Sequence, residues 1–216
     1  MIASAARRRR PADRALGAAS SVRRETILQA ALRCFNAAGY EWTTIRDICA
    51  ESGASIGSVY HLFDEKQSIA GALYLEGVRE WSCRVIEAVR SAADTEAAAR
   101  GAVRAYLDWL TENPEWYAFC AAHRVLGRRS AARSEVEKVF RALELAIVER
   151  FGAAAARGEV ISLPADAYRP MLLGPVYSIM IDRLCRTNPD APTLDWVPTA
   201  DEREAFADHA WRALRR

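Results

Sequence analysis

Side chains able to hydrogen-bond to phosphate oxygens and to nucleobase edges gather in one short stretch of this 216-residue chain, residues 44–61. Hydroxyl, guanidinium, phenol and imidazole groups are mixed there with small residues, and a small residue lets a backbone approach a ligand closely. The chemistry that this mixture can carry is recognition of a polyanion and of base edges. The candidate contacts are Thr44, Arg46, Ser55, Gly57, Ser58, Tyr60 and His61.

Two short helices joined by a tight turn would position these side chains. Apolar residues at helical spacing give each helix one buried face. Gly53 stands at the break, where glycine can adopt the left-handed backbone that ends a helix and reverses the chain. The pattern predicts a helix-turn-helix, whose second helix enters the major groove of DNA. The buried faces are Ile45, Ile48 and Cys49 in the first helix and Ile56, Val59 and Phe63 in the second.

The rest of the chain also has helical spacing, and neither strand-like alternation nor an internal repeat stands out. Capping residues mark several helix starts: Thr44 with Asp47, Ser55, Asp64 with Gln67, and Thr199 with Glu202. Residues 187–198 hold three prolines and are expected to form a loop. Helices are predicted over residues 22–38, 65–91, 96–110, 114–126, 134–157, 165–186 and 200–214.

These elements divide an all-α chain into three parts. Residues 1–21 are expected to form a disordered basic arm, residues 22–68 a three-helix DNA-binding domain, and residues 69–216 a larger helical bundle. The boundary falls inside or beside the helix that starts near residue 65, and no flexible linker separates the two domains. We therefore expect mechanical coupling through that helix.

Positive charge is concentrated at the N-terminus. The whole chain has a formal net charge of only +2, but residues 1–24 hold seven arginines and one aspartate, a net of +6. Residues 25–66, which include the predicted helix-turn-helix, hold three basic and six acidic side chains, a net of −3 that is unfavourable toward a polyanion. Two interpretations of the arm stay open: a solubilising tail, or a segment that contacts DNA phosphates or the minor groove.

The sequence contains no feature that directs it to a membrane or to an oxidising compartment. The arm lacks the apolar centre of a secretory signal, and no run of about 18 apolar residues exists to span a bilayer. The five cysteines are widely spaced and form no C-x-x-C pair, which argues against a disulfide framework or a zinc site. We expect a cytoplasmic protein without metal or cofactor.

The helix-turn-helix region resembles the TetR family of transcriptional regulators, over roughly residues 22–70. In that resemblance Thr44 and Arg46 meet phosphate or a base edge, and the residues that open the second helix contact the groove. Lys66 corresponds to the lysine with which the family clamps the DNA backbone. The residues that carry the resemblance are Ala30, Ala31, Phe35, Gly39, Tyr40, Thr43, Thr44, Asp47, Ile48, Gly53, Ser55, Gly57, Ser58, Val59, Tyr60, Phe63 and Lys66.

One position departs from the family pattern. Family members often have a histidine immediately before the phenylalanine, whereas here Leu62 is at that place and the histidine is His61. A shift of one residue turns a side chain by about 100° around a helix, so His61 faces the groove at a different point. Core packing is assigned to Phe63 but not to Tyr60, because Val59 already fills that buried turn. The operator sequence therefore cannot be inferred from the operator of a relative.

The resemblance implies that residues 69–216 dimerise and enclose a small-molecule pocket. Dimerisation is also a physical requirement, because one short recognition helix reads few base pairs. The apolar segment 171–180, with Phe206, Ala210 and Leu214 of the last helix, is the expected dimer face; the alternative is that this segment is the bundle's central helix. The predicted pocket residues, for which ordinary core packing is the alternative, are Trp81, Tyr106, Trp109, Trp116, Phe119, His123, Phe140, Tyr177 and Met180.

The leading functional hypothesis is a homodimeric repressor that a small hydrophobic or aromatic effector releases from a palindromic operator on double-stranded DNA. An activator, or a ligand-independent regulator with a closed core, is the alternative within the DNA-binding class. A helical small-molecule-binding protein or enzyme is the alternative from another class. It has little support, because the three histidines are far apart and no motif for metal-assisted hydrolysis, acyl transfer or phosphate binding is present.

Overall fold

The computed structural model describes residues 11–123, 130–186 and 197–216, and the regular secondary structure of these residues is helical, with one isolated bridge between Val160 and Arg215. The predicted all-α class is confirmed. None of the helices within these ranges has the length and apolarity needed to cross a bilayer. The elements are α1 (Pro11–Ala38), α2 (Ile45–Ser52), α3 (Ile56–Leu62), α4 (Lys66–Ser91), α5 (Thr95–Glu112), α6 (Pro114–Ala122), α8 (Arg133–Ala156), the 3-10 helix η1 (Ala165–Ala167), α9 (Tyr168–Arg186) and α10 (Ala200–Leu214).

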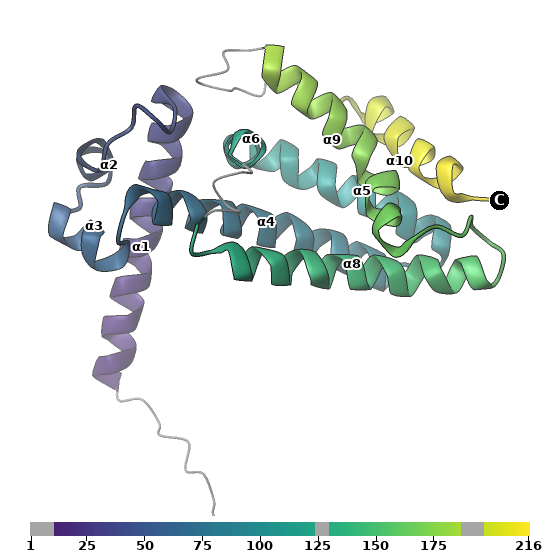
Figure 1. Ribbon diagram of the computed structural model, residues 1–216, viewed down its shortest axis with the longest axis horizontal. Helices are drawn as coiled ribbons and strands as arrows, with labels where there is room; N and C mark the ends of the chain where they lie inside the picture. Colours follow the sequence, from purple (N-terminus) through teal and green to yellow (C-terminus); the bar gives the residue numbers. More distant parts are fainter. Residues whose placement is uncertain (1–10, 124–129, 187–196) are drawn as a thin grey trace, which may run out of the picture.

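Two hydrophobic cores lie along α4. The first joins α1, α2, α3 and the first half of α4 to Phe119 and Cys120 of α6 and Val136 of α8. The second joins the rest of α4 to α5, α6, α8, α9 and α10. Ile69 and Leu73 belong to the first core, while Val85 and Val89 of the same helix belong to the second. Figure 1 shows α1 crossing the end of the long helices, with α2 and α3 beside it. The two units are thus joined by a continuous helix rather than by a linker.

Local sequence signals account for the helix-turn-helix. Thr44 and Asp47 form the predicted reciprocal capping box at α2, and the Ser55 hydroxyl accepts from the Ser58 N–H at the start of α3. Gly53 ends α2 with a φ of 68°, a left-handed conformation that side chains with a Cβ rarely adopt. The predicted cap at Asp64 is wrong: Glu65 occupies the N-cap position of α4, and it makes no side-chain capping hydrogen bond.

The first helix starts earlier than predicted. It begins at Pro11, not near Val22, so residues 11–21 of the expected disordered arm are helical. A proline suits the first position of a helix, and the alanines that follow it are strong helix formers, which outweighs the absence of an apolar stripe. In Figure 1 the N-terminal half of α1 extends beyond α2 and α3. Residues 1–10, and most of the predicted 187–198 loop, lie outside the described residues.

Part of the predicted dimer face is instead internal to the protomer. Ala210 and Leu214 of α10 are buried in the second core, where α10 packs against α5. Several residues of the apolar segment 171–180 are buried in the same core: Leu172, Leu173, Val176 and Met180. Met171 and Ile179 of α9 remain exposed. Within the described residues, the exposed part of the predicted segment 171–180 is therefore a narrow apolar stripe on α9.

Helices α4 and α6 approach closely at Gly77. A Cβ added there would lie 2.6 Å from Cys120 Sγ and 3.3 Å from Trp116 Cε3. A Gly77→Ala change should therefore destabilise the protein by about 1–3 kcal/mol, as overpacked cores do, measured as the free energy of unfolding in urea.

Two further variants control this prediction. Gly77→Ala combined with Cys120→Ala should recover most of the loss, because the sulfur atom is the nearest obstacle. Gly152→Ala in α8 should be neutral or stabilising, since a Cβ there meets only Val148 Cγ1 at 4.0 Å and alanine favours a helix. Equal stability of Gly77→Ala and the native chain would disprove the close contact.

Candidate DNA interface and ligand pocket

The helix-turn-helix presents its polar residues outward. Ile48, Val59 and Phe63 are buried beneath α2 and α3, as expected, whereas Ile56 is 46% exposed because it begins α3 and projects past the core. Tyr60 is 51% exposed, which confirms that it is not a core residue. The other candidate DNA contacts Thr44, Arg46, Ser55, Gly57 and His61 are exposed as well, and Ser58 is half-buried.

The N-terminus of α2 already holds a carboxylate. Asp47 Oδ2 accepts hydrogen bonds from both the Thr44 N–H and the Thr44 hydroxyl, each at 2.7 Å. These hydrogen bonds lower the pKa of the Asp47 carboxyl. A phosphate contact by the Thr44 hydroxyl would therefore have to compete with the Asp47 carboxylate.

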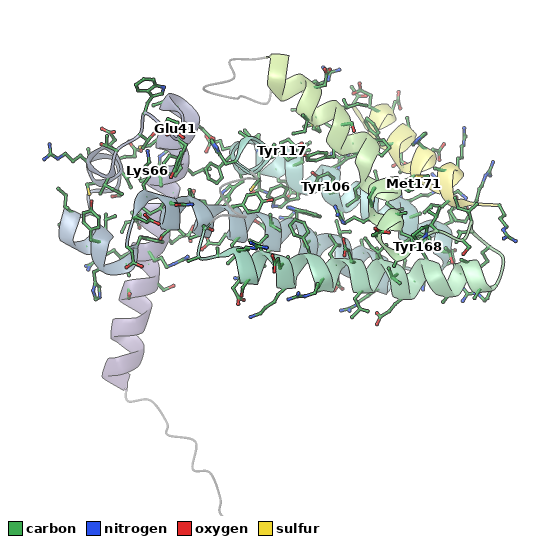
Figure 2. The ribbon with its side chains drawn as sticks, in the orientation of Figure 1. Glu41, Lys66, Tyr106, Tyr117, Tyr168 and Met171 are labelled. Atoms are coloured by element: carbon green, nitrogen blue, oxygen red, sulfur yellow. The ribbon has the colours of Figure 1, made fainter. Side chains whose placement is uncertain are left out.

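Lys66, predicted to contact the DNA backbone, makes three hydrogen bonds within the protein. Its ammonium donates to the carbonyl oxygens of Tyr40, Glu41 and Thr43 at 2.7, 3.2 and 2.9 Å, and Nζ lies 4.4 Å from the centroid of the Tyr40 ring. Figure 2 shows Lys66 beside the segment that contains Glu41. Because three carbonyls occupy the three donors of the ammonium, Lys66 fastens the start of α4 to the α1–α2 loop, and a contact with the DNA backbone would have to compete with these hydrogen bonds.

Little free positive charge remains on the described DNA-binding unit. Arg33 pairs with Glu51 at 2.6 Å, and Arg24 pairs with Glu76 of α4 at 2.5 Å. Arg46 is exposed and in no ion pair with any residue that the structure describes. Arg46 is thus the cation of α2 and α3 best placed for a phosphate or a base edge.

A Tyr60→Ala change should weaken operator binding by about tenfold to a hundredfold, because it removes both the hydrogen bonds of the phenol and the apolar contact of its ring with the DNA. The phenol is half exposed and lies outside the core, so the thermal midpoint should stay within a few degrees of that of the native protein. Fluorescence anisotropy with a labelled operator measures the affinity. Leu145→Ala, at an exposed apolar residue of α8, serves as the matched control and should bind DNA normally.

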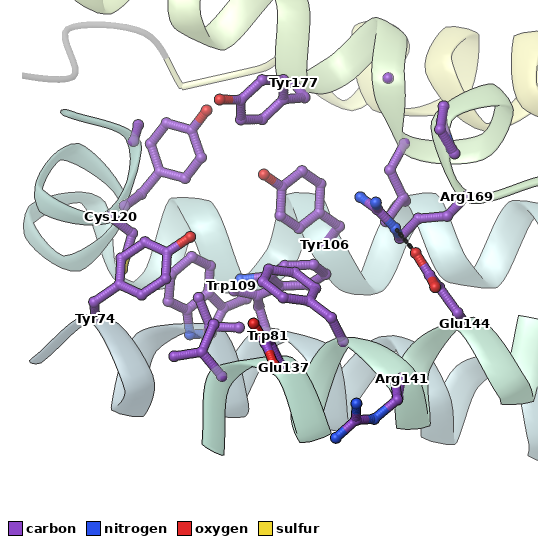
Figure 3. Close-up of a pocket in the computed structure, with 18 of the residues that line it drawn as sticks. Tyr74, Trp81, Tyr106, Trp109, Cys120, Glu137, Arg141, Glu144, Arg169 and Tyr177 are labelled. Carbon is purple, nitrogen blue, oxygen red and sulfur yellow. Dashed lines mark hydrogen bonds and ion pairs between the residues drawn. The ribbon is translucent and has the colours of Figure 1, made fainter. Parts of the chain in front are cut away.

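A pocket of about 850 Å³ lies in the helical body, between α4, α5, α6, α8 and α9. Figure 3 shows aromatic side chains from several of these helices around a common space. Of the nine predicted pocket residues, five line this cavity: Trp81, Tyr106, Trp109, Phe140 and Tyr177.

Four predicted pocket residues lie elsewhere. Phe119 is fully buried in the first core and stacks on Phe35, with 5.7 Å between ring centroids. His123 packs against Tyr40 and Phe119, and burial lowers the pKa of its imidazole. Met180 is buried in the second core, and Trp116 packs beside Gly77 without lining the cavity. On α6 the residues that face the pocket are offset around the helix from those that face α1.

The sequence prediction missed Tyr74 and the charged lining of the pocket. Tyr74 and Tyr117 line it from α4 and α6, and five charged residues line it from α8 and the start of α9: Arg133, Glu137, Arg141, Glu144 and Arg169. Their spacing is a signal that could have been read, because the four on α8 recur at intervals of three or four residues and so share one face. Arg133 pairs with Glu137 at 2.8 Å, and Arg169 pairs with Glu144 at 3.4 Å.

Burial keeps the interior of the pocket uncharged. It raises the pKa of the Tyr106 and Tyr117 phenols and of the Cys120 thiol, so all three stay protonated near neutral pH. Among the described residues no group of histidine, cysteine and carboxylate side chains could hold a metal ion. The pocket can therefore bind a largely apolar molecule and offer it neutral hydrogen-bonding groups.

Comparison with known proteins agrees with this arrangement. Residues 27–73 match the model of the bacterial regulatory proteins, tetR family. The chain is 35% identical over 100 residues to the transcriptional repressor AcnR of Corynebacterium diphtheriae, covering 45% of this chain and 46% of the relative. It is 29% identical over 142 residues to the repressor KstR2 of Rhodococcus jostii, covering 64% and 69%. The match thus spans less than half the length of AcnR.

Solved structures extend the likeness of the fold to nearly the whole chain. A TetR family transcription regulator from Marinobacter aquaeolei has a TM-score of 0.70 at 15% identity, covering 91% of this chain and 97% of that one. At this identity the likeness concerns the fold alone, while the matched helix-turn-helix model and the two repressors supply the family. The helix-turn-helix domain of this chain belongs to the TetR family of transcriptional regulators, which bind DNA through this element.

Proposed function

We propose that this regulator is a homodimeric repressor that leaves a palindromic operator when a small, mostly apolar or aromatic effector enters the helical body. The observation that carries the proposal is the 850 Å³ pocket, two of whose wall helices, α4 and α6, also pack against α1 of the DNA-binding unit. The two curated relatives are both named as repressors, which supports the sign of regulation.

Two helices, α6 and α4, would carry a signal from the pocket to the DNA-binding unit. Tyr117, Cys120 and Ala121 of α6 line the cavity, and the same helix meets α1 through the Phe35–Phe119 stack and the hydrogen bond from Asn36 Nδ2 to the Glu115 carbonyl at 2.9 Å. The start of α4 is fastened to the α1–α2 loop by Lys66. A ligand that displaces α4 or α6 would therefore move the recognition helix of each protomer and change their separation.

The experiment is selection of bound DNA from a random pool with the full-length protein, followed by a screen for compounds that release the recovered site. We expect a palindromic sequence with half-sites one helical turn apart, and release by apolar ring compounds. Tyr60→Ala, carried through the same selection, is the control and should enrich the recovered site more weakly than the native protein does. Recovery of a non-palindromic site would contradict the dimer, and a screen without releasing compounds would contradict effector control.

A further inference from the structure

The two ends of the pocket differ in chemistry. Four tyrosines line it from α4, α5, α6 and the middle of α9, whereas every charged lining residue comes from α8 or the start of α9. Figure 3 shows Tyr74 and Tyr106 directing their hydroxyls into a common space, with Arg169 and Glu144 on the other side of Tyr106. The tyrosines are Tyr74, Tyr106, Tyr117 and Tyr177.

The tyrosine end contains a buried hydroxyl without a well-formed hydrogen bond. Tyr117 is only 2% exposed, and although its hydroxyl interacts with that of Tyr106, it makes no hydrogen bond of normal geometry with any residue in the described ranges. A buried hydroxyl without a partner is costly, and an acceptor on a ligand would remove that cost. Among the residues that the structure describes, no lysine or arginine lines the cavity from α4, α5 or α6, so a carboxylate placed among the tyrosines would be buried without a cation from these helices. An uncharged acceptor therefore suits this end of the pocket.

The charged end contains an unused cation. Arg133 pairs with Glu137 and Arg169 pairs with Glu144, while Arg141 between them forms no ion pair within the described part of the chain. The five charged lining residues sum to a net of +1. An anionic group on a ligand would meet this exposed guanidinium without displacing an existing ion pair.

Aromatic rings fill the space between the two ends. Trp81 meets Tyr106 edge to face at 5.2 Å between centroids, and it meets Phe140 at 6.1 Å. Their surfaces would bury a flat apolar body.

We propose that the pocket takes an elongated, ring-containing acid that carries a carbonyl oxygen at one end and an anionic group at the other. Tyr117 donates to the carbonyl oxygen, Trp81 and Phe140 cover the rings, and Arg141 pairs with the anion. This assignment rests on the proposed function, because it names the chemical class of the effector.

Three matched probes test the assignment in the absence of DNA. The first is 4′-acetylbiphenyl-4-carboxylate, the second is 4′-ethylbiphenyl-4-carboxylate, which lacks the carbonyl oxygen, and the third is 4-acetylbiphenyl, which lacks the anion. Titration calorimetry with the full-length protein should show the first binding about tenfold tighter than either of the others, the value of one added hydrogen bond or ion pair.

Variants assign each end of the probe to a residue. Tyr117→Phe should weaken the acetyl acid about tenfold and leave the ethyl acid unchanged. Arg141→Gln should weaken both acids and leave 4-acetylbiphenyl unchanged. Arg157→Gln, an exposed arginine that does not line the cavity, is the control and should change none of the three affinities.

The outcomes separate this assignment from the proposed function. Equal affinity of the acetyl and ethyl acids for the native protein overturns the carbonyl subsite, even if Tyr117→Phe does not fold. Failure of the acetyl acid to bind overturns the ligand class. Release of the operator by some other compound would leave effector control standing in either case, since DNA release is a separate measurement.

Discussion

In the proposed homodimer, replacing Ile179 with glutamate is expected to leave the protein monomeric. Its binding to the proposed palindromic operator should weaken on the order of a hundredfold, the loss that follows when two linked half-site contacts become one. Ile179 is 38% exposed on α9, and Met171 is exposed two turns earlier on the same helix. A carboxylate in the middle of an apolar contact would be desolvated without a partner. The protomer's own core should be unaffected, because Ile179 belongs to neither buried cluster.

Sedimentation velocity measures the oligomeric state of this variant, and anisotropy measures its affinity for the full operator and for a half-site. Half-site affinity should match that of the native protein, since the helix-turn-helix is untouched. Leu145→Glu, at a residue of α8 that is 55% exposed, is the matched control and should stay dimeric. A dimeric Ile179→Glu protein with native operator affinity would place the interface elsewhere.

The helix-turn-helix could be predicted in detail because its signals are local. Thr44 and Asp47 are three residues apart, and each caps the other without help from the rest of the fold. Gly53 ends α2 by its own conformational freedom. The exposure of Tyr60 followed from Val59 filling the same turn. Each of these inferences needed only a few neighbouring residues.

The contacts of Lys66 could not be predicted from neighbouring residues in the sequence. Its position at the start of α4 is compatible with a DNA contact, and its long side chain can reach in more than one direction. What decides its role is the approach of the Tyr40, Glu41 and Thr43 carbonyls, which lie 23–26 residues earlier in the chain. That approach depends on how α1 and α4 pack, and residue spacing does not encode it.

The pocket was predictable only in part for a related reason. Aromatic density identified the right helices, but a residue on α6 can face either the cavity or α1. Phe119 and Tyr117 are two residues apart and lie on different sides of that helix, in the first core and in the cavity lining. The charged residues of α8 and α9 meet at the pocket only because the two helices come together, with Glu144 and Arg169 separated by 25 positions.

Deleting residues 1–10 is expected to flatten the salt dependence of operator binding without unfolding the protein. The deleted segment holds Arg7, Arg8, Arg9 and Arg10. The truncation ends before Pro11 because α1 begins at that residue. If all four arginines of each protomer neutralise phosphates, eight in the proposed dimer, the slope of log affinity against log salt concentration should become shallower by up to about 7. The effect should be visible because residues 25–66 carry a net of −3 and can release few counterions themselves.

Two full-length variants separate charge from chain length in this experiment. Changing Arg7, Arg8, Arg9 and Arg10 together to lysine keeps four positive charges and should keep the native slope, whereas changing them to glutamine should reproduce the deletion. Because counterion release depends on charge, arginine and lysine contribute equally to the salt slope, although the planar, more weakly hydrated guanidinium is better suited to insertion into a narrow minor groove. A native slope with a loss of affinity in the lysine variant would therefore indicate minor-groove insertion in addition to phosphate contact. An unchanged slope in both the deletion and the glutamine variant would mean that residues 1–10 do not touch DNA.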